Sequence, residues 1–211
     1  MRVLPRLYPI LDVDAAHARG MSARELAGIW IDAGVRLFQV RAKALSGRAW
    51  LELVEGLVEQ TRPGGVQLIV NDRADIARMT GAAGVHVGQD DIPPAAAREV
   101  VGLSALIGLS THTDAQVDAA LREPVDYVAM GPVYATGTKA APDPVVGESG
   151  VSRAAAKALA SGLPLVAIGG ITLALAPAVI AAGASSAAVI SDLLVGDPAV
   201  RIRQFLTALT L

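Results

Sequence analysis

The sequence predicts an α/β protein, a single-domain (β/α)₈ (TIM) barrel over residues 1–211. Eight short apolar runs recur along the chain, and each is followed by a segment with helical features. Strict alternation of strands and helices implies a parallel sheet, and eight such units can close into a barrel. The alternative is an open doubly wound sheet, but no GxGxxG sequence follows the first apolar run. Turns such as Ala33-Gly34 and Ala182-Gly183-Ala184 also place glycine where a helix ends and a strand begins.

The predicted strands are short and largely apolar, as is typical of parallel strands that are covered on both faces. In chain order they are Leu7–Leu11, Leu37–Arg41, Gln67–Val70, Gly84–Val87, Leu106–Leu109, Tyr127–Met130, Leu165–Ile168 and Ser186–Ile190.

Helices are predicted after these strands. Ser22 and Glu25 have the spacing of a capping box at the start of one helix, and apolar residues recur at helical spacing in the next. In chain order the helices are Ser22–Ala33, Trp50–Thr61, Ala74–Thr80, Pro93–Val101, Asp114–Leu121, Ser152–Ala160, Leu175–Ala182 and Pro198–Leu209.

The composition excludes several classes of function. A net charge of −2 and the lack of any Lys/Arg run give no basic surface for nucleic acid or anionic lipid, so neither partner is expected. The chain has no cysteine, which excludes disulfides, thiolate metal ligands and a cysteine nucleophile. The N-terminus has no apolar segment of signal-peptide form, and a cytoplasmic protein is expected.

The stretch Ala158–Ser191 contains no charged residue and is long enough to cross a bilayer. Proline and glycine residues divide it, however, at Pro164, Gly169-Gly170, Pro177 and Gly183. The pieces are typical of a strand, a loop, a helix, a turn and a strand. We therefore interpret this stretch as buried core.

Polar and glycine residues gather directly after seven of the predicted strands. In a barrel these positions share one face, which is where barrel enzymes place their active sites. Any one group is ordinary turn chemistry, but their convergence predicts an enzyme. The groups are Gln39, Arg41 and Lys43; Asn71 and Asp72; Gln89, Asp90 and Asp91; Ser110, Thr111 and His112; Thr136, Thr138 and Lys139; Gly169 and Gly170; and Ile190 and Ser191.

The residue types in these groups indicate phosphorylated ligands. Arg41, Lys43 and Lys139 suit phosphate oxygens, although each alone is also compatible with a surface salt bridge. Asp72 and Asp91 follow neighbouring strands and are suited to share Mg²⁺. Acid/base catalysis by this pair is an alternative, and Asp91 could instead cap the helix that follows it.

A second anion site is predicted at the ends of the last two strands, formed by Gly169-Gly170 and Ile190-Ser191 through backbone N–H groups. Two anion sites imply a diphosphate and a monophosphate bound together. Ser110 and His112 are too close along an extended chain to face each other. His86 is interpreted as a strand histidine with a structural hydrogen bond, and His17 as a solvated loop residue. Without a nucleophile–base–acid triad, catalysis by leaving-group stabilisation is favoured.

Seven segments, in this order and spacing, resemble the thiamine-phosphate synthase (thiamine-phosphate pyrophosphorylase) family over nearly the whole chain. They are Phe38–Lys43, Val70–Asp75, Gly84–Asp91, Ile107–His112, Asp126–Tyr134, Thr136–Lys139 and Ala167–Ile171.

This resemblance implies a (β/α)₈ barrel that joins hydroxymethylpyrimidine diphosphate to hydroxyethylthiazole phosphate, or its carboxylated form, and releases diphosphate and thiamine phosphate. It also implies a small homo-oligomer, whereas no nucleic-acid or membrane partner is expected from the composition and the divided apolar stretch. The roles that it implies for individual residues are as follows. Mg²⁺ is bound by Asp72 and Asp91; the pyrimidine diphosphate by Gln39, Val40, Arg41, Ala42, Lys43, Asn71, Ser110 and Lys139, of which Arg41, Lys43, Ser110 and Lys139 are catalytic; and the thiazole phosphate by Thr136, Gly137, Thr138, Gly170, Ile190 and Ser191.

The sequence departs from the family pattern at three positions. Leu11 stands where Thr is usual before Asp12, Ala42 replaces a frequent Glu, and Ala135 stands where Pro is common. None of these changes removes a phosphate-binding or metal-binding group. The proline-containing segment Ala140–Glu148 is expected to be a loop that closes over bound substrate.

Two other functions remain open. A related thiazole tautomerase would share the barrel and the thiazole-phosphate site, with His112 as an acid or base. A non-catalytic sensor of thiamine phosphate would bind the product without turnover. The set of Asp72, Asp91, Arg41, Lys43 and Lys139 favours the synthase over both.

Overall fold

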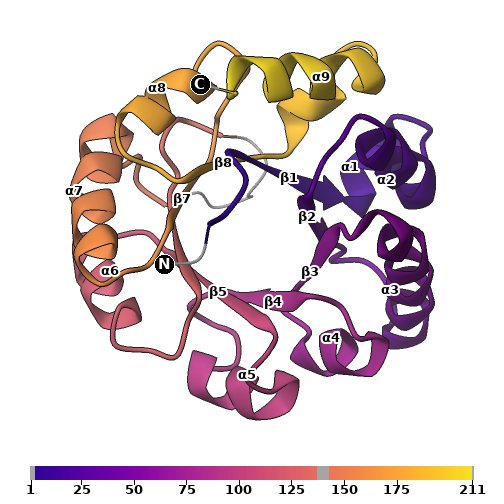
Figure 1. Cartoon of the computed structure of the whole chain (residues 1–211), viewed down its shortest axis with the longest axis horizontal. Coiled ribbons are helices and arrows are strands. Elements are labelled where there is room, and N and C mark those ends of the chain that lie inside the picture. Colours follow the sequence, from indigo (N-terminus) through magenta and orange to yellow (C-terminus); the bar gives the residue numbers. More distant parts are fainter. Residues whose placement is uncertain (1–2, 137–142, 211) are drawn as a thin grey trace.

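The structure is a computed structural model that describes residues 3–136 and 143–210, and it contains one closed barrel of eight parallel strands. The strands pair in chain order from β1 to β8, and β8 pairs with β1 (Figure 1). Their bounds are β1 Leu7–Asp12, β2 Leu37–Arg41, β3 Gln67–Asn71, β4 Gly84–Val87, β5 Leu106–Thr111, β6 Tyr127–Met130, β7 Leu165–Ile168 and β8 Ser186–Val189. The predicted fold class and strand number are confirmed.

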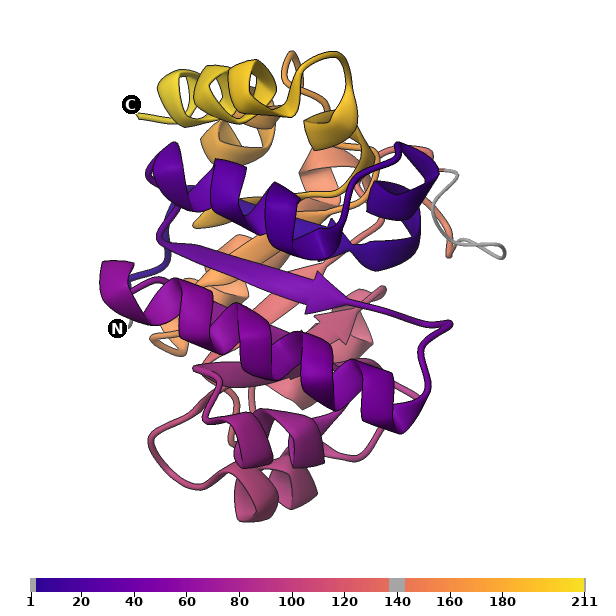
Figure 2. The ribbon, with the colours of Figure 1, turned by 90° about the vertical axis from the view of Figure 1, so that its right-hand side faces the viewer.

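Helices form a shell around the barrel, and Figure 2 shows α2 and α3 lying along its outer side. The α-helices are α1 Val13–Ala18, α2 Ala23–Asp32, α3 Gly47–Thr61, α4 Ala74–Thr80, α5 Pro94–Val101, α6 Asp114–Ala120, α7 Gly147–Ala160, α8 Ala176–Ala181 and α9 Pro198–Ala208. The part of the chain that the structure describes also contains two short 3₁₀ helices, η1 Arg62–Gly64 and η2 Ser191–Leu194. The capping box predicted at Ser22 and Glu25 is present at the start of α2.

Helix α1 corrects one prediction. His17 is exposed, as expected, but it lies in this helix and not in a loop. The helix follows β1 directly because the Asp12 side chain accepts a hydrogen bond from the backbone N–H of Ala15 at 3.0 Å. The sequence reading missed it because its six residues are too few to establish an apolar periodicity.

Helix α7 begins earlier than predicted. Gly147 and Glu148 lie in its first turn and not in the expected loop. The rest of the predicted loop Ala140–Glu148 is partly outside the described residues, and Asp143–Val146 has no regular structure. The uncharged stretch Ala158–Ser191 is divided between the end of α7, β7, α8, β8 and the start of η2, as predicted. Within residues 3–136 and 143–210, no helix combines the length and apolar character needed to cross a membrane.

The core has two parts, set by the alternation of side chains along each strand. One set of side chains, such as Val40 and Val85, packs between the strands and the helices. The alternate set points into the barrel and includes Tyr8, Ile69 and Tyr127. Small residues Ala129 and Ala188 also face this interior, which leaves open space toward the carboxyl ends of the strands. The barrel therefore has a filled floor and an open mouth.

Candidate active site

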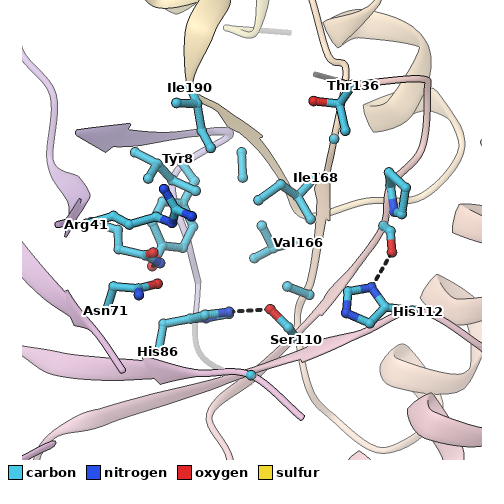
Figure 3. A pocket seen from close by; sticks show the side chains of 18 of the residues that line it. Tyr8, Arg41, Asn71, His86, Ser110, His112, Thr136, Val166, Ile168 and Ile190 are labelled. Atoms are coloured by element: carbon cyan, nitrogen blue, oxygen red, sulfur yellow. Dashed lines mark hydrogen bonds between the residues drawn. The ribbon is translucent and has the colours of Figure 1, made fainter. Parts of the chain in front are cut away.

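A cavity of about 580 Å³ opens at the carboxyl ends of the strands (Figure 3). Residues from every strand or from the loop that follows it contribute to its wall. The lining residues are Tyr8, Ile10, Gln39, Arg41, Lys43, Asn71, Asp72, His86, Gly88, Gln89, Asp90, Asp91, Ser110, His112, Gln116, Ala129, Gly131, Pro132, Thr136, Asp143, Val166, Ile168, Gly169, Gly170, Ile171, Ala188, Val189, Ile190 and Ser191.

The structure brings most of the predicted site residues to this one cavity. Strand alternation explains this, because Gln39, Arg41 and Ser110 lie on the inward-facing positions of their strands. Val40 and Ala42 lie on the opposite phase, and their side chains pack in the outer core. Only their backbone is therefore left for contact with a ligand. The predicted residues Gly137, Thr138 and Lys139 lie outside the described residues.

Cationic and carboxylate groups gather on the side of the cavity formed by β1 to β4. Arg41 is ion-paired with Asp12, its register partner on the neighbouring strand. Both are largely buried, with side-chain exposures of 18% for Arg41 and 7% for Asp12. Lys43 is exposed on the loop after β2, and Asn71 ends β3. This side of the cavity can bind a strongly anionic group.

Asp72 and Asp91 meet at the rim of this side. Burial, together with a hydrogen bond and negative charge from Asp91, raises the pKa of the Asp72 carboxyl to about 6. Asp72 has a φ of 63°, the left-handed conformation that aspartate tolerates better than most residues. Asp91 accepts a hydrogen bond from the backbone N–H of Gly88 at 2.7 Å. Two neighbouring carboxylates repel each other when both are ionised, and a cation bound between them would relieve this repulsion.

The alternative role of Asp91 as a helix cap is not found. The N-cap residue of α5 is Pro93, and no side chain caps that helix. Asp91 instead holds the turn after β4 through the N–H of Gly88. Among residues 3–136 and 143–210, no group of three or more His, Cys, Asp or Glu side chains is placed to hold a metal. A metal bound by Asp72 and Asp91 would therefore need further ligands from water or substrate.

A buried chain of hydrogen bonds forms the floor of the cavity. Gln39 Nε2 donates to the Tyr8 hydroxyl at 3.1 Å, and the Tyr8 and Tyr127 hydroxyls are 2.7 Å apart. The Tyr127 hydroxyl lies 3.0 Å from His86 Nδ1. On the other side of the ring, His86 Nε2 lies 2.8 Å from Ser110 Oγ (Figure 3). The predicted structural hydrogen bond of His86 is confirmed, and it is made at both ring nitrogens.

Burial explains the ionisation states of the histidine and the two tyrosines in this hydrogen-bond chain. It lowers the pKa of His86 to about 4, so the imidazole is neutral near pH 7. It also raises the pKa of Tyr8 to about 12 and raises that of Tyr127, so both phenols keep their hydrogens. The sequence reading missed Tyr8 and Tyr127 as site residues. The available signal was that both lie in predicted strands, at positions whose alternation points inward.

His112 is separate from this chain. Its Nδ1 donates to the carbonyl oxygen of Gly131 at 2.7 Å, and its backbone N–H donates to Gln116 Oε1 at 2.7 Å. Asp143 lies 3.6 Å from the same Nδ1. Because Ser110 contacts His86 and His112 contacts Gly131, the prediction that Ser110 and His112 do not face each other is confirmed.

The opposite side of the cavity is formed by the loops after β6, β7 and β8. Gly170 has a φ of 66°, and a Cβ there would lie 2.5 Å from the carbonyl oxygen of Ala135. Only glycine fits this close approach of two loops. Ser191 begins η2, and the side chain of Asp192 accepts a hydrogen bond from the backbone N–H of Leu173 at 2.8 Å. The loops after β7 and β8 are thus held together around the cavity.

An apolar wall lies between the two polar sides. It includes Val166 and Ile168 on β7 and Ile190 directly after β8 (Figure 3). Ala129 and Ala188 leave room beside them. A wall of this kind can pack against flat rings and exclude water, whereas the polar sides bind charged groups.

Comparison with known proteins agrees with this geometry. A family model described as thiamine monophosphate synthase matches residues 7–193. The chain is 46% identical over 208 residues to a thiamine-phosphate synthase of Koribacter versatilis (strain Ellin345), which covers 98% of this chain and 96% of the relative. It is 40% identical over 204 residues to a thiamine-phosphate synthase of Chloroflexus aurantiacus, which covers 97% of this chain and 92% of the relative. A solved structure of a thiamine phosphate pyrophosphorylase from Pyrococcus furiosus superimposes with a TM-score of 0.84 and 25% identity, over 97% of this chain and 95% of the other.

Proposed function

Because this chain belongs to the thiamine monophosphate synthase family, we propose that it joins 4-amino-5-hydroxymethyl-2-methylpyrimidine diphosphate to hydroxyethylthiazole phosphate or its carboxylated form. The products are thiamine phosphate and diphosphate, with carbon dioxide as a further product from the carboxylated substrate, and the enzyme is a transferase. The observation that carries the proposal is one cavity with a side rich in cationic and carboxylate groups, an opposite side formed by the loops after β6, β7 and β8, and an apolar wall between them. This arrangement suits two phosphorylated ring compounds bound at the same time.

The diphosphate is assigned to the side formed by β1 to β4. Arg41 offers a planar fork of donors, Lys43 a point charge and Asn71 an amide. Ser110 and Lys139 complete the set that we assign to this substrate, together with Gln39 and the backbone of Val40 and Ala42. The catalytic contribution of Arg41, Lys43, Ser110 and Lys139 is to stabilise negative charge on the departing diphosphate.

The thiazole phosphate is assigned to the opposite side. Gly170, Ile190 and Ser191 present backbone groups at the ends of β7 and β8, and Thr136 lies on the neighbouring loop. Gly137 and Thr138 are included in this assignment by the resemblance of the segment that contains them. The thiazole ring would then lie against the apolar wall, beside the pyrimidine ring.

Asp72 and Asp91 fit a magnesium ion. Burial, and after it the neighbouring Asp91, raises the pKa of the Asp72 carboxyl, and a hard divalent cation held by both carboxylates would offset their mutual repulsion. When bound, Mg²⁺ would neutralise charge on the diphosphate as a Lewis acid. The two aspartates would hold it with oxygens of water and substrate.

The reaction then needs no proton transfer by the protein. The bond from the pyrimidine methylene to the diphosphate oxygen breaks, and the electron pair leaves with the diphosphate. The thiazole nitrogen forms the new C–N bond with its own lone pair. The apolar wall of Val166, Ile168 and Ile190 excludes water that would otherwise capture the cationic methylene. His86 is neutral near pH 7, and this route does not require it to act as a base.

The test is formation of thiamine phosphate from both substrates by the purified protein, followed by mass spectrometry, with Mg²⁺ and again with a chelator. Product that forms only with Mg²⁺ would support both the reaction and the metal. Isomerisation of the thiazole substrate without joining would instead support the tautomerase. Product binding without any turnover would support the sensor.

A further inference from the structure

The hydrogen-bond chain from Gln39 to Ser110 requires a residue without a side chain at position 108, which is Gly108. A Cβ at Gly108 would lie 2.1 Å from Cζ of Tyr127 and 2.4 Å from Nδ1 of His86. The missing side chain is what allows the Tyr127 ring to stack on the His86 ring, with centroids 5.5 Å apart and planes at 28°. The hydrogen bond between Tyr127 and His86 therefore depends on the absence of a side chain at Gly108.

The hydrogens of this chain can be assigned one by one. The Gln39 amide nitrogen only donates, so the Tyr8 oxygen accepts. The single hydrogen of Tyr8 then goes to the Tyr127 oxygen, and the hydrogen of Tyr127 goes to the bare Nδ1 of His86. A neutral imidazole without a hydrogen on Nδ1 carries it on Nε2, which donates to Ser110 Oγ.

The other assignment is less satisfactory. If Tyr127 donated to Tyr8, the Tyr8 oxygen would accept two hydrogen bonds and its own hydrogen would have no acceptor in the chain. Tyr8 is 1% exposed, so an unused hydroxyl hydrogen there would be costly. In the one-way order from Gln39 to Ser110, the hydrogens of Tyr8, Tyr127 and the His86 ring all have an acceptor.

We propose that Tyr8, Tyr127 and His86 are positioning residues that fix Ser110 as a hydrogen-bond donor toward a diphosphate oxygen of the bound substrate. Ser110 Oγ accepts from His86, so its own hydrogen is the one that points to the ligand. The acceptor must carry lone pairs and gain negative charge as the reaction proceeds, which describes an oxygen of the leaving diphosphate. The identity of this acceptor rests on the proposed function, whereas the direction of the chain does not.

The direction is tested on the free protein by ¹⁵N NMR of histidine-labelled protein at pH 7. The protein has three histidines, and a His86→Gln variant identifies the resonances of His86 by their loss. The expected result is the Nε2–H tautomer, with a bare Nδ1. The Nδ1–H tautomer would reverse the chain and overturn the proposal. This measurement needs no substrate, so it can succeed even where the proposed function fails.

The positioning role is tested by a double-mutant cycle. Ser110→Ala removes the donor, and we expect kcat to fall by about 100-fold, as for other single donors to a developing anion. Tyr127→Phe keeps the ring and removes only the hydroxyl, and we expect kcat to fall by about 10-fold with a smaller change in KM for the thiazole phosphate. The double variant should be no slower than Ser110→Ala, because both changes remove the same interaction.

Binding of inorganic diphosphate with Mg²⁺, measured by calorimetry, gives a readout without turnover. Both Ser110→Ala and Tyr127→Phe should weaken this binding by several-fold. Thr61→Val is the matched control, because it removes another buried hydroxyl that bonds to a backbone carbonyl in α3, and it should leave kcat and diphosphate binding unchanged. Additive losses in the cycle, or diphosphate binding that is unaffected by Tyr127→Phe, would overturn the proposal.

Discussion

Asp12 contacts the Arg41 guanidinium with one carboxylate oxygen and caps helix α1 with the other. The two residues are register partners on β1 and β2, so the contact follows from strand pairing. A cation that is 18% exposed and held by a carboxylate that is 7% exposed has a restricted orientation. Asp12 therefore both begins the helix after β1 and aims Arg41 into the cavity.

Replacing Asp12 by Asn should separate these two tasks. Asparagine is also a good N-cap residue, so α1 should be kept, whereas the charge that orients Arg41 is lost. We expect KM for the pyrimidine diphosphate to rise by about 10-fold, the scale of one hydrogen bond to a charged group. Steady-state kinetics against each substrate provides the measurement. Asp14→Asn, on the exposed first turn of the same helix, is the control. An unchanged KM would mean that Arg41 is positioned by other contacts.

The paired carboxyl groups predict that metal binding depends on pH. Because Asp72 has a pKa of about 6, it is partly protonated at pH 5.5 and ionised at pH 7.5, so Mg²⁺ should bind more tightly at the higher pH. Calorimetry in two buffers of different ionisation enthalpy should also detect proton release on binding at pH 6. Asp91→Ala should abolish this response and keep thiazole-phosphate binding. A variant that retained full Mg²⁺-dependent turnover would exclude Asp91 as a ligand.

The same group makes a prediction about stability without metal. The pKa of Asp72 is raised from 3.8 to about 6, so between these values the folded state binds more protons than the unfolded state. The stabilisation from protonated Asp72 is therefore lost as pH rises through about 6. The Asp72→Asn variant lacks this loss, and asparagine tolerates the positive φ. The measurement is urea unfolding with a chelator present. Between pH 4.5 and pH 7, the free energy of unfolding of the variant should increase relative to that of the wild type. The lowered pKa of His86 is common to both proteins and cancels from the comparison. The assignment of this pH dependence to Asp72 would be contradicted if the difference in unfolding free energy between variant and wild type did not change with pH. It would also be contradicted if the Asp118→Asn variant showed the same pH-dependent difference.

Gly170 provides a test of the proposed thiazole-phosphate site. A Cβ at this position would lie 2.5 Å from the Ala135 oxygen and 2.8 Å from the Tyr134 Cβ, in addition to the strain of a φ of 66°. Gly196 has a similar φ of 68° with no atom within 4 Å of a built Cβ. Gly196→Ala should therefore cost only the backbone strain of about 1–2 kcal/mol. Gly170→Ala should cost more in a thermal unfolding experiment and raise KM for the thiazole phosphate selectively. Equal effects of the two variants would show that loop contact at Gly170 is unimportant.

The fold could be predicted from the sequence because barrel strands are marked by local patterns. The predicted bounds of β2, β4, β6, β7 and α4 agree with the structure. Side-chain alternation and the common face of the strand ends also placed Arg41, Asp72 and Ser110 together. The pairings within the site were not predictable in the same way. The contact between Asp12 and Arg41 depends on the register between β1 and β2, and the contacts of the Tyr8 hydroxyl depend on strand register and on the space left by Gly108. Neither strand register nor this space has a local signature in the sequence.

The contact between Asp192 and Arg201 links the loops after β7 and β8 to helix α9. Asp192 Oδ2 accepts from the Leu173 N–H at 2.8 Å and from Arg201 Nη2 at 2.5 Å, and the two charged side chains are 13% and 19% exposed. Asp192→Ala would leave a mostly buried guanidinium and a loop N–H without this partner. We expect a loss of about 3 kcal/mol in the free energy of unfolding and a raised KM for the thiazole phosphate. Asp118→Ala removes an exposed partner of Lys157 and should cost less than about 1 kcal/mol. Chemical unfolding and kinetics on both variants would check this. If Asp192→Ala lost stability with KM unchanged, the link would serve the fold alone; if it lost neither, the loops after β7 and β8 would be held by other contacts.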